Sequence, residues 1–350
     1  MSATASSTIW SESVGSLPPD EVVFGQSPAM LAMRNRMERL AVAAVPVLIQ
    51  GESGTGKEII CRLIHQRSPW NEGPFVKVNC PAIPGTLLES ELFGYEKGSF
   101  TGAYGAKLGR VELAHGGTLF LDEIAELDPS LQAKLLQLLQ DGQFSRIGAQ
   151  SDTMVKVRVV CATNRDLEEE IGLGNFRQDL FYRINVVNLQ LPPLRERLMD
   201  IPVLCDYFLA VYGEKFNTRP RPISARVIAM LQGYRWAGNI RELENLIKRY
   251  VILGSEEAIT SELLNHEQDP LDVDIATDGS ISLKTVTRRA VRELEKKIIL
   301  KVLQANNWNR KQSAHVLKIS YRALLYKLKD AGVTNGRPSA RRAALTGLND

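Results

Sequence analysis

The sequence has little cysteine and no long apolar run. Its four cysteines stand far apart among 350 residues, which argues against a disulfide framework or a cysteine metal site and predicts reduced, buried thiols. No apolar stretch approaches the length of a membrane span. Residues 1–19 are polar and Ser-rich, without the apolar segment of a signal peptide. We therefore expect a cytoplasmic protein that does not insert into a membrane.

The chain also lacks a large net charge, because 43 Lys+Arg face 40 Asp+Glu and leave a net charge of only +3. The charges are nevertheless unevenly placed. Residues 283–342 contain 16 Lys+Arg and 3 Asp+Glu, whereas the rest of the chain contains 27 and 37. A basic C-terminal segment on a mildly acidic body predicts nucleic-acid binding. The alternative is a basic face that contacts only solvent.

Short apolar strands alternate with helical stretches over about 22–192, which predicts an open, mainly parallel α/β sheet. The expected strands are Val47–Ile49, Phe75–Val78, Thr118–Leu121, Val157–Ala162 and Val186–Leu191. Helical patterns alone then follow, as a small helical subdomain and a second all-helical unit. The predicted divisions are a disordered leader 1–21, an α/β domain 22–192 with a helical part 193–255, a linker 256–283, a helical unit 284–333 and a tail 334–350.

A glycine-rich stretch, Gly51–Glu58, follows the first strand, and its Lys57 opens an amphipathic helix. Glycines allow backbone N–H groups to converge on a phosphate, and a helix N-terminus adds partial positive charge. We therefore predict a nucleoside triphosphate site; a plain tight turn is the alternative. Glu58 stands where Ser or Thr usually offers a hydroxyl to Mg²⁺. The predicted contacts are Gly51, Glu52, Ser53, Gly54, Thr55, Gly56, Lys57 and Glu58.

Two carboxylates, Asp122 and Glu123, follow the third expected strand. Ligands of α/β sheets bind at the carboxyl ends of the strands. We expect Asp122 to hold Mg²⁺ and Glu123 to polarise the attacking water. Taken alone, such a pair could equally be a strand meeting a solvated loop.

Together these motifs resemble those of the AAA+ activators of sigma-54 RNA polymerase, the bacterial enhancer-binding proteins. The resemblance spans about 22–332, includes the acidic last position of Gly51–Glu58, and implies a P-loop NTPase fold with a parallel sheet and a helical lid. It implies ATP and Mg²⁺ as cofactors. It also implies a switch residue, Asn79, and two nucleotide sensors, Asn164 and Arg241. It also implies that Arg177 and Arg183 act on the nucleotide of a neighbouring subunit. Catalysis then needs an oligomer, which is a hexamer in the family.

The loop Gly98–Ala103 resembles the family signature that grips sigma-54. Glycines frame an aromatic residue, which predicts an exposed tip that contacts a partner; burial of Phe100 in the core is the alternative. The expected contacts are Gly98, Ser99, Phe100, Thr101, Gly102 and Ala103, with Ser99 in place of the usual alanine. A second candidate contact is the stretch 142–148, for which a plain strand connection is the alternative.

The C-terminal helical unit resembles a Fis-type helix-turn-helix. A turn at 318–320 joins two short helices, the second of them basic, as in a reader helix for the major groove. The expected DNA contacts are Ser320, Tyr321, Arg322, Tyr326 and Lys327. A three-helix bundle with a charged face is the alternative.

The leading hypothesis is an activator that binds upstream DNA, hydrolyses ATP and converts the closed complex of sigma-54 RNA polymerase holoenzyme into the open complex. The resemblance is to members without an N-terminal regulatory domain, which implies control by a trans-acting protein or by hetero-oligomers with a paralogue. One alternative is an AAA+ loader or origin-binding remodeller, against which Gly98–Ala103 argues. Another is a DNA-binding regulator that no longer drives sigma-54, for which Ser99 and Ala237 (usually proline) are the hints.

Overall fold

The computed structural model describes residues 17–266, 299, 302–303, 306 and 309–330. The chain divides into two units, 1–263 and 264–350, and each is considered by itself. The expected leader is described only from residue 17. Most of the expected linker and the tail lie outside the described residues.

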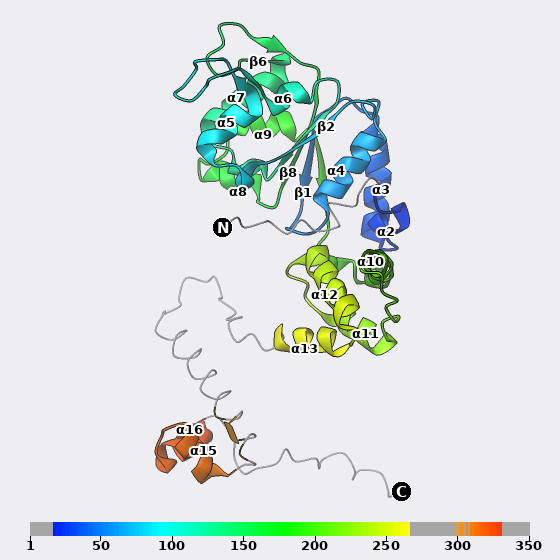
Figure 1. Ribbon diagram of the computed structural model, residues 1–350, viewed down its shortest axis with the longest axis vertical. Helices are drawn as coiled ribbons and strands as arrows, with labels where there is room; N and C mark the ends of the chain where they lie inside the picture. The colour runs from blue at the N-terminus through cyan, green and yellow to red at the C-terminus, as the bar shows by residue number, and fades with distance from the viewer. Residues whose placement is uncertain (1–16, 267–298, 300–301, 304–305, 307–308, 331–350) are drawn as a thin grey trace, which may run out of the picture. The chain divides into compact units, whose positions relative to one another are not determined.

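A five-stranded parallel sheet forms the centre of the first unit (Figure 1). In spatial order its strands are β2 (Phe75–Asn79), β5 (Thr118–Asp122), β8 (Arg158–Thr163), β1 (Val47–Gln50) and β9 (Val187–Gln190). All five strands expected from the sequence are confirmed, with each end within one residue. Because they are parallel, their carboxyl ends meet at one edge of the sheet.

Successive side chains of the buried strands enter two different cores, as the period of two requires. Val47 and Ile49 pack with α3 (Pro28–Ala41) and α4 (Lys57–Gln66), whereas Leu48 packs on the other face. That second face is covered by α5 (Gly85–Phe93), α6 (Arg110–Leu113), α7 (Pro129–Asp141) and α9 (Gln178–Ile184). Shorter elements are α2 (Asp20–Phe24), α8 (Leu167–Gly172) and the 3₁₀ turns Cys80–Ala82, Ile124–Glu126, Leu194–Glu196 and Leu198–Asp200.

The helical part of the first unit confirms the predicted helical subdomain and corrects one boundary. Its helices are α10 (Ile201–Lys215), α11 (Ala225–Gly233), α12 (Asn239–Leu253) and α13 (Glu257–His266). Helix α13 lies where the sequence predicted a linker from 256. Ile259 and Leu263, four residues apart, are buried in the same core as α10 and α12. The acidic composition of this stretch hid a helix that these two side chains anchor, together with an ion pair between Arg249 and Glu262.

Two small antiparallel ladders flank the main sheet. In the first, β3 (Gly94–Tyr95) pairs with β4 (Lys107–Leu108), and the loop 96–106 joins them. In the second, β6 (Gln143–Phe144) pairs with β7 (Thr153–Met154). A bridge between Tyr95 and Ile147 connects the two ladders.

The second unit contains α15 (Arg310–Val316) and α16 (Tyr321–Asp330), as the helix-turn-helix interpretation predicted. Lys318, in the turn, has a left-handed backbone with φ of 53°. Ser320 accepts a hydrogen bond from the Ala323 N–H at 3.1 Å and so caps α16. A small core joins these helices, made of Ile299, Leu303, Ala314, Leu324 and Leu328. The first part of the predicted helical unit, 284–308, falls mainly outside the described residues.

All four cysteines are buried with free thiols, as expected. Burial raises the pKa of Cys80 and of Cys205 to about 12. Within 17–266 and the described parts of the second unit, no helix is long and apolar enough to cross a membrane.

Candidate functional site

The carboxyl edge of the sheet brings together most of the polar residues singled out in the sequence. The stretch Gly51–Glu58 follows β1, Asn79 ends β2, Asp122 ends β5 and Asn164 follows β8. A pocket of about 150 Å³ lies there. It is lined by Ser53, Gly54, Gly56, Lys57, Glu58, Lys77, Asn79, Asp122, Glu123 and Arg241.

The glycine loop has the backbone that a phosphate cradle needs. Gly54 and Gly56 have φ of 78° and 100°, which L side chains rarely adopt. A Cβ on Gly54 would lie 2.4 Å from the Gly238 carbonyl oxygen. The Lys57 ammonium donates to the Gly51 carbonyl at 2.8 Å and lies inside the loop, 7% exposed. Backbone donors, a helix N-terminus and a lysine therefore converge on one pocket.

Glu123 is held in a strained position beside this lysine. Its φ is 57°, a left-handed conformation that is uncommon outside glycine and concentrates at functional sites. One carboxylate oxygen lies 3.3 Å from the Lys57 ammonium, and the other accepts from the Asn164 N–H at 2.9 Å. Asn79 is paired in register with Asp122 and lines the same pocket. Its switch function stays a prediction, because Lys57 and Asn164 hold Glu123 here.

Asp122 has the surroundings of a metal-binding carboxylate. Burial raises its pKa, and the nearby Lys77 ammonium opposes that rise. Among the described residues, no group of three or more His, Cys, Asp or Glu could form a complete cage for a metal ion. Mg²⁺ commonly binds through one or two carboxylates together with phosphate oxygens and water. Asp122, as one carboxylate ligand beside a phosphate pocket, fits Mg²⁺ on that basis.

The lid helix α12 begins directly against the glycine loop. The Arg241 guanidinium donates to the Ser53 hydroxyl at 2.9 Å, and the Ile240 N–H donates to the Gly54 carbonyl at 3.0 Å. The first turn of α12 is therefore joined to the glycine loop by direct hydrogen bonds. The structure brings Arg241 to the loop, and its function as a nucleotide sensor stays a prediction.

Three residues that sequence reasoning missed also hold this loop. Arg195 forms two hydrogen bonds to the Glu52 carboxylate at 2.6 and 2.9 Å and, together with Asn239, lowers the Glu52 pKa to about 2. Arg197, which is buried, donates to the Thr55 carbonyl at 3.0 Å, and its burial lowers its pKa to about 10. No local sequence pattern predicts these contacts. The only sequence signal was the arginine pair shortly after the last strand.

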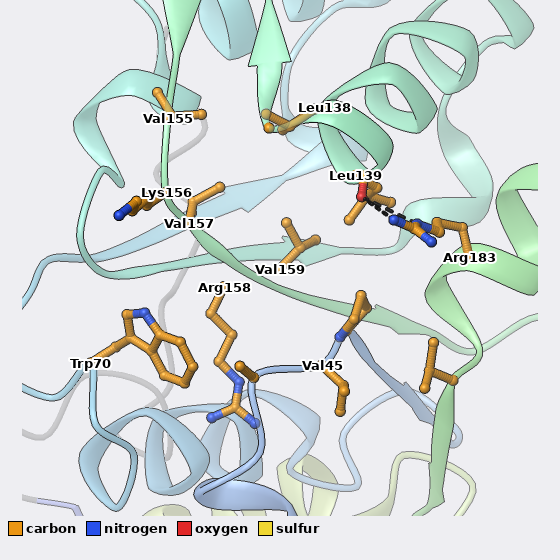
Figure 2. A pocket seen from close by; sticks show the side chains of 14 residues that line it. Val45, Trp70, Leu138, Leu139, Val155, Lys156, Val157, Arg158, Val159 and Arg183 are labelled. Carbon is orange, nitrogen blue, oxygen red and sulfur yellow. Dashed lines mark hydrogen bonds between the residues drawn. The ribbon is translucent and has the colours of Figure 1, made fainter.

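The two arginines predicted to act on a neighbour lie away from the pocket. Arg177 pairs with Asp179 at 2.7 Å, with both side chains exposed. Arg183 donates to the Leu139 carbonyl at 2.9 Å and lines a separate cavity of about 540 Å³ beside the amino ends of β1 and β8. Figure 2 shows Arg183 and Trp70 on opposite sides of this cavity. Neither arginine reaches the phosphate pocket of its own chain.

The loop Gly98–Ala103 projects its aromatic residue only partly. Phe100 is 44% exposed and meets the Tyr95 ring edge-on at 4.9 Å. The Gly98 N–H donates to the Ala103 carbonyl at 2.9 Å, which closes the loop. Phe100 is therefore not in the core, and the alternative of a buried side chain is wrong. Tyr104, which the sequence reasoning passed over, is 91% exposed beside it.

The second candidate contact, 142–148, stays a prediction, but its aromatic side chain is buried. Phe144 is 1% exposed and packs against Phe93 with ring centroids 6.0 Å apart. Its strand pairing with β7 turns the ring into the core. The aromatic residue of this stretch does not face a partner.

The side chains predicted to contact DNA lie on α16 and at the turn before it. Tyr321, Arg322 and Tyr326 are exposed, and Lys327 is half-buried. Ser320 serves as a helix cap, a geometry that also allows a phosphate contact. These side chains form one polar and aromatic surface next to the turn.

Three protein-family models match the chain. They are the sigma-54 interaction domain over 23–190, the AAA+ ATPase lid domain over 195–273 and the Fis family of bacterial regulatory proteins over 290–330. Response regulator protein PilR of Pseudomonas aeruginosa is 42% identical over 318 residues, which cover 90% of this chain and 71% of PilR. Regulatory protein AtoC of Escherichia coli is 44% identical and is covered over 68% of its length. The chain belongs to the family of sigma-54-dependent transcriptional activators.

Comparison with solved structures supports the fold. NtrX of Brucella abortus in complex with ATP has a TM-score of 0.66 and 36% identity, over 88% of this chain and 69% of NtrX. The predicted fold is thus confirmed: an AAA+ ATPase domain with a parallel sheet and a helical lid, followed by a helix-turn-helix. The lid match to residue 273 agrees with the helix found at 257–266. The Nif-specific regulatory protein of Azotobacter vinelandii, 41% identical, is covered over 59% of its length.

Proposed function

We propose that this activator binds upstream DNA, hydrolyses ATP as an oligomer and remodels the closed complex of sigma-54 RNA polymerase into the open complex. The observation that carries the proposal is the combination of two features in one domain. A phosphate pocket lies at the carboxyl edge of the sheet, and a half-exposed Phe100 lies on a closed, glycine-framed loop. An ATPase pocket with an exposed apolar tip suits work done on a protein partner.

Each pocket residue has a task that follows from its position. Lys57 would contact the phosphates, and Asp122 would hold Mg²⁺, which neutralises developing phosphate charge when bound. Glu123, positioned by Lys57 and by the Asn164 N–H, would polarise the attacking water. The Asn79 amide can hydrogen-bond this carboxylate without adding charge, which suits a switch that takes Glu123 out of line.

Arg177 and Arg183 would complete the pocket of a neighbouring subunit, as a hexameric ring allows. Neither side chain lines the pocket of its own chain, which leaves both available to a neighbouring subunit. Mixing two inactive variants tests it: Glu123→Gln lacks the base, and Arg183→Ala lacks the arginine. Mixed rings contain interfaces with both groups intact, so we expect ATPase activity to return on mixing. Activity of Arg183→Ala alone near the wild-type level would contradict the shared site. Mixing Arg183→Ala with a paralogue that keeps its own arginine would detect shared rings in the same way.

The exposed face of α16 would bind double-stranded DNA in the major groove. Arg322 would carry a base or phosphate contact, with Lys327 and Tyr326 beside it. We expect Arg322→Ala to weaken binding to upstream DNA at least tenfold in an electrophoretic mobility assay. Lys311→Ala, on the preceding helix, is the matched control. An unchanged affinity of Arg322→Ala would remove that contact from the proposal.

Open-complex formation with purified sigma-54 holoenzyme tests the whole proposal. The wild type is expected to open promoter DNA only with ATP, and Phe100→Ala is expected to retain ATPase activity but lose opening. Met154→Ala removes another exposed apolar side chain and is the matched control. Absence of ATP-dependent opening by the wild type would falsify the proposal. Such a machine would act in the bacterial cytoplasm, under a controlling partner.

A further inference from the structure

Glu58, the unusual last residue of the glycine loop, is engaged by two cations. One carboxylate oxygen accepts from the Arg62 guanidinium at 2.8 and 2.9 Å. The other oxygen accepts from the Lys77 ammonium at 2.5 Å. The Glu58 side chain is only 14% exposed. It therefore does not act as a free acidic group beside the phosphate pocket.

Lys77 is the middle residue of β2, and it connects Glu58 to the metal-binding edge. Its ammonium lies 3.8 Å from one Asp122 oxygen as well as 2.5 Å from Glu58. All three side chains line the same pocket as Lys57 and Glu123. Lys77 thus bridges two carboxylates, one of which is the predicted Mg²⁺ ligand.

The charges around this pocket alternate. Lys57 lies beside Glu123, and Lys77 lies between Glu58 and Asp122. Two carboxylates this close repel each other unless a cation lies between them. A divalent cation bound at Asp122 would perform the same task and would be repelled by the ammonium already there.

We propose that Lys77 is a positioning residue of the metal–nucleotide site, whose ammonium bridges Glu58 and Asp122 and gives up Asp122 when a divalent cation binds. The inference rests on the proposed Mg²⁺–ATP site. It explains how an acidic residue can replace the usual hydroxyl: Arg62 and Lys77 neutralise Glu58, and the cost is competition between Lys77 and the metal. The charge of Lys77 then sets how much Mg²⁺ the site requires.

Mg²⁺ titrations of nucleotide binding test this directly. The measurement is the binding of a fluorescent ADP analogue to the full chain at rising Mg²⁺ concentration, starting from EDTA. Lys77→Met keeps the apolar stem and removes the charge, so we expect the half-saturating Mg²⁺ concentration to fall about fivefold or more. Lys77→Arg should stay near the wild type. Lys134→Met, which removes a lysine paired with Glu89 elsewhere in the domain, is the control for loss of any surface charge.

A second variant should change the Mg²⁺ requirement in the opposite direction. It also tests the inference if Lys77→Met does not fold. Glu58→Gln leaves Lys77 with Asp122 alone, so its half-saturating Mg²⁺ concentration should rise. An unchanged or raised requirement in folded Lys77→Met would overturn the inference. So would weaker binding both with and without Mg²⁺, which would make Lys77 a phosphate contact. Wild-type binding that is independent of Mg²⁺ would instead remove the proposed metal site itself.

Discussion

Phe100 and Phe144 occupy similar stretches of sequence but differ in exposure to solvent. Each is an aromatic residue framed by glycines. Phe100 lies in the loop between β3 and β4 and is 44% exposed, whereas Phe144 lies in β6 and is 1% exposed. The difference comes from pairing: a strand must turn alternate side chains inward, and a loop tip need not. A glycine-framed aromatic therefore indicates a partner surface only where the backbone is not in a ladder.

The stretch 142–148, which carries the buried Phe144, also supports the loop that carries Phe100. The Glu96 N–H donates to the Ile147 carbonyl at 3.0 Å, and the Ile147 N–H donates to the Gly94 carbonyl at 3.0 Å. Arg146 connects Glu96 at 2.8 Å with Glu112 at 2.7 Å. The loop that carries Phe100 is thus held at its base by the stretch 142–148.

The contrast between the two aromatic residues predicts the largest effect on stability. Phe144→Ala leaves a cavity beside Phe93 and should lower the free energy of unfolding by about 3–5 kcal/mol. Phe100→Ala loses mainly its contact with Tyr95 and should cost about 1 kcal/mol or less. Urea denaturation of both variants measures the difference. Equal losses would mean that Phe100 is a core residue in solution.

How much of the structure the sequence predicts depends on how far apart in the chain the contacting residues lie. Strands and the carboxylates that follow them, such as Asp122, were predictable because local periodicity and parallel topology fix them. The exposure of Phe100 was expected from its glycines, whereas the burial of Phe144 follows from its pairing with Thr153 in β7, which no sequence pattern indicated. Lys77, Arg195 and Arg197 were missed because their partners are distant in the chain. Such contacts exist only after the fold brings the segments together.

Gly148 tests the contact between the two stretches. Its φ is 77°, and a Cβ there would lie 2.6 Å from the Ser99 Cβ. We expect Gly148→Ala to cost about 2–3 kcal/mol through backbone strain plus the clash. Gly174→Ala is the matched control, because its φ of 78° is the same and nothing lies within 4 Å. If the two variants lose equal stability, the loops do not pack as described; Ser99→Gly should relieve the excess.

Arg146 tests the ionic part of the same contact. Arg146→Met removes the pairs to Glu96 and Glu112, and the partly exposed setting limits the loss to about 1 kcal/mol. The loss should shrink at high salt, because surface pairs are screened. Arg110→Met, which removes a 3.7 Å pair to Glu91, should cost less. Thermal denaturation at two ionic strengths measures both, and a loss for Arg146→Met that salt does not change would assign its effect to packing.

Ser99 gives the smallest expected effect, and its sign is the informative part. Its hydroxyl oxygen is buried between the two loops without a hydrogen-bond partner in the described part of the chain. A buried unsatisfied hydroxyl is unfavourable, so Ser99→Ala should raise the free energy of unfolding by about 0.5–1 kcal/mol. Ser145→Ala is the control with the opposite sign, because that hydroxyl donates to Asp152. A destabilised Ser99→Ala would show that the serine has a partner in solution, and thus that the loop carrying Phe100 lies differently against Gly148.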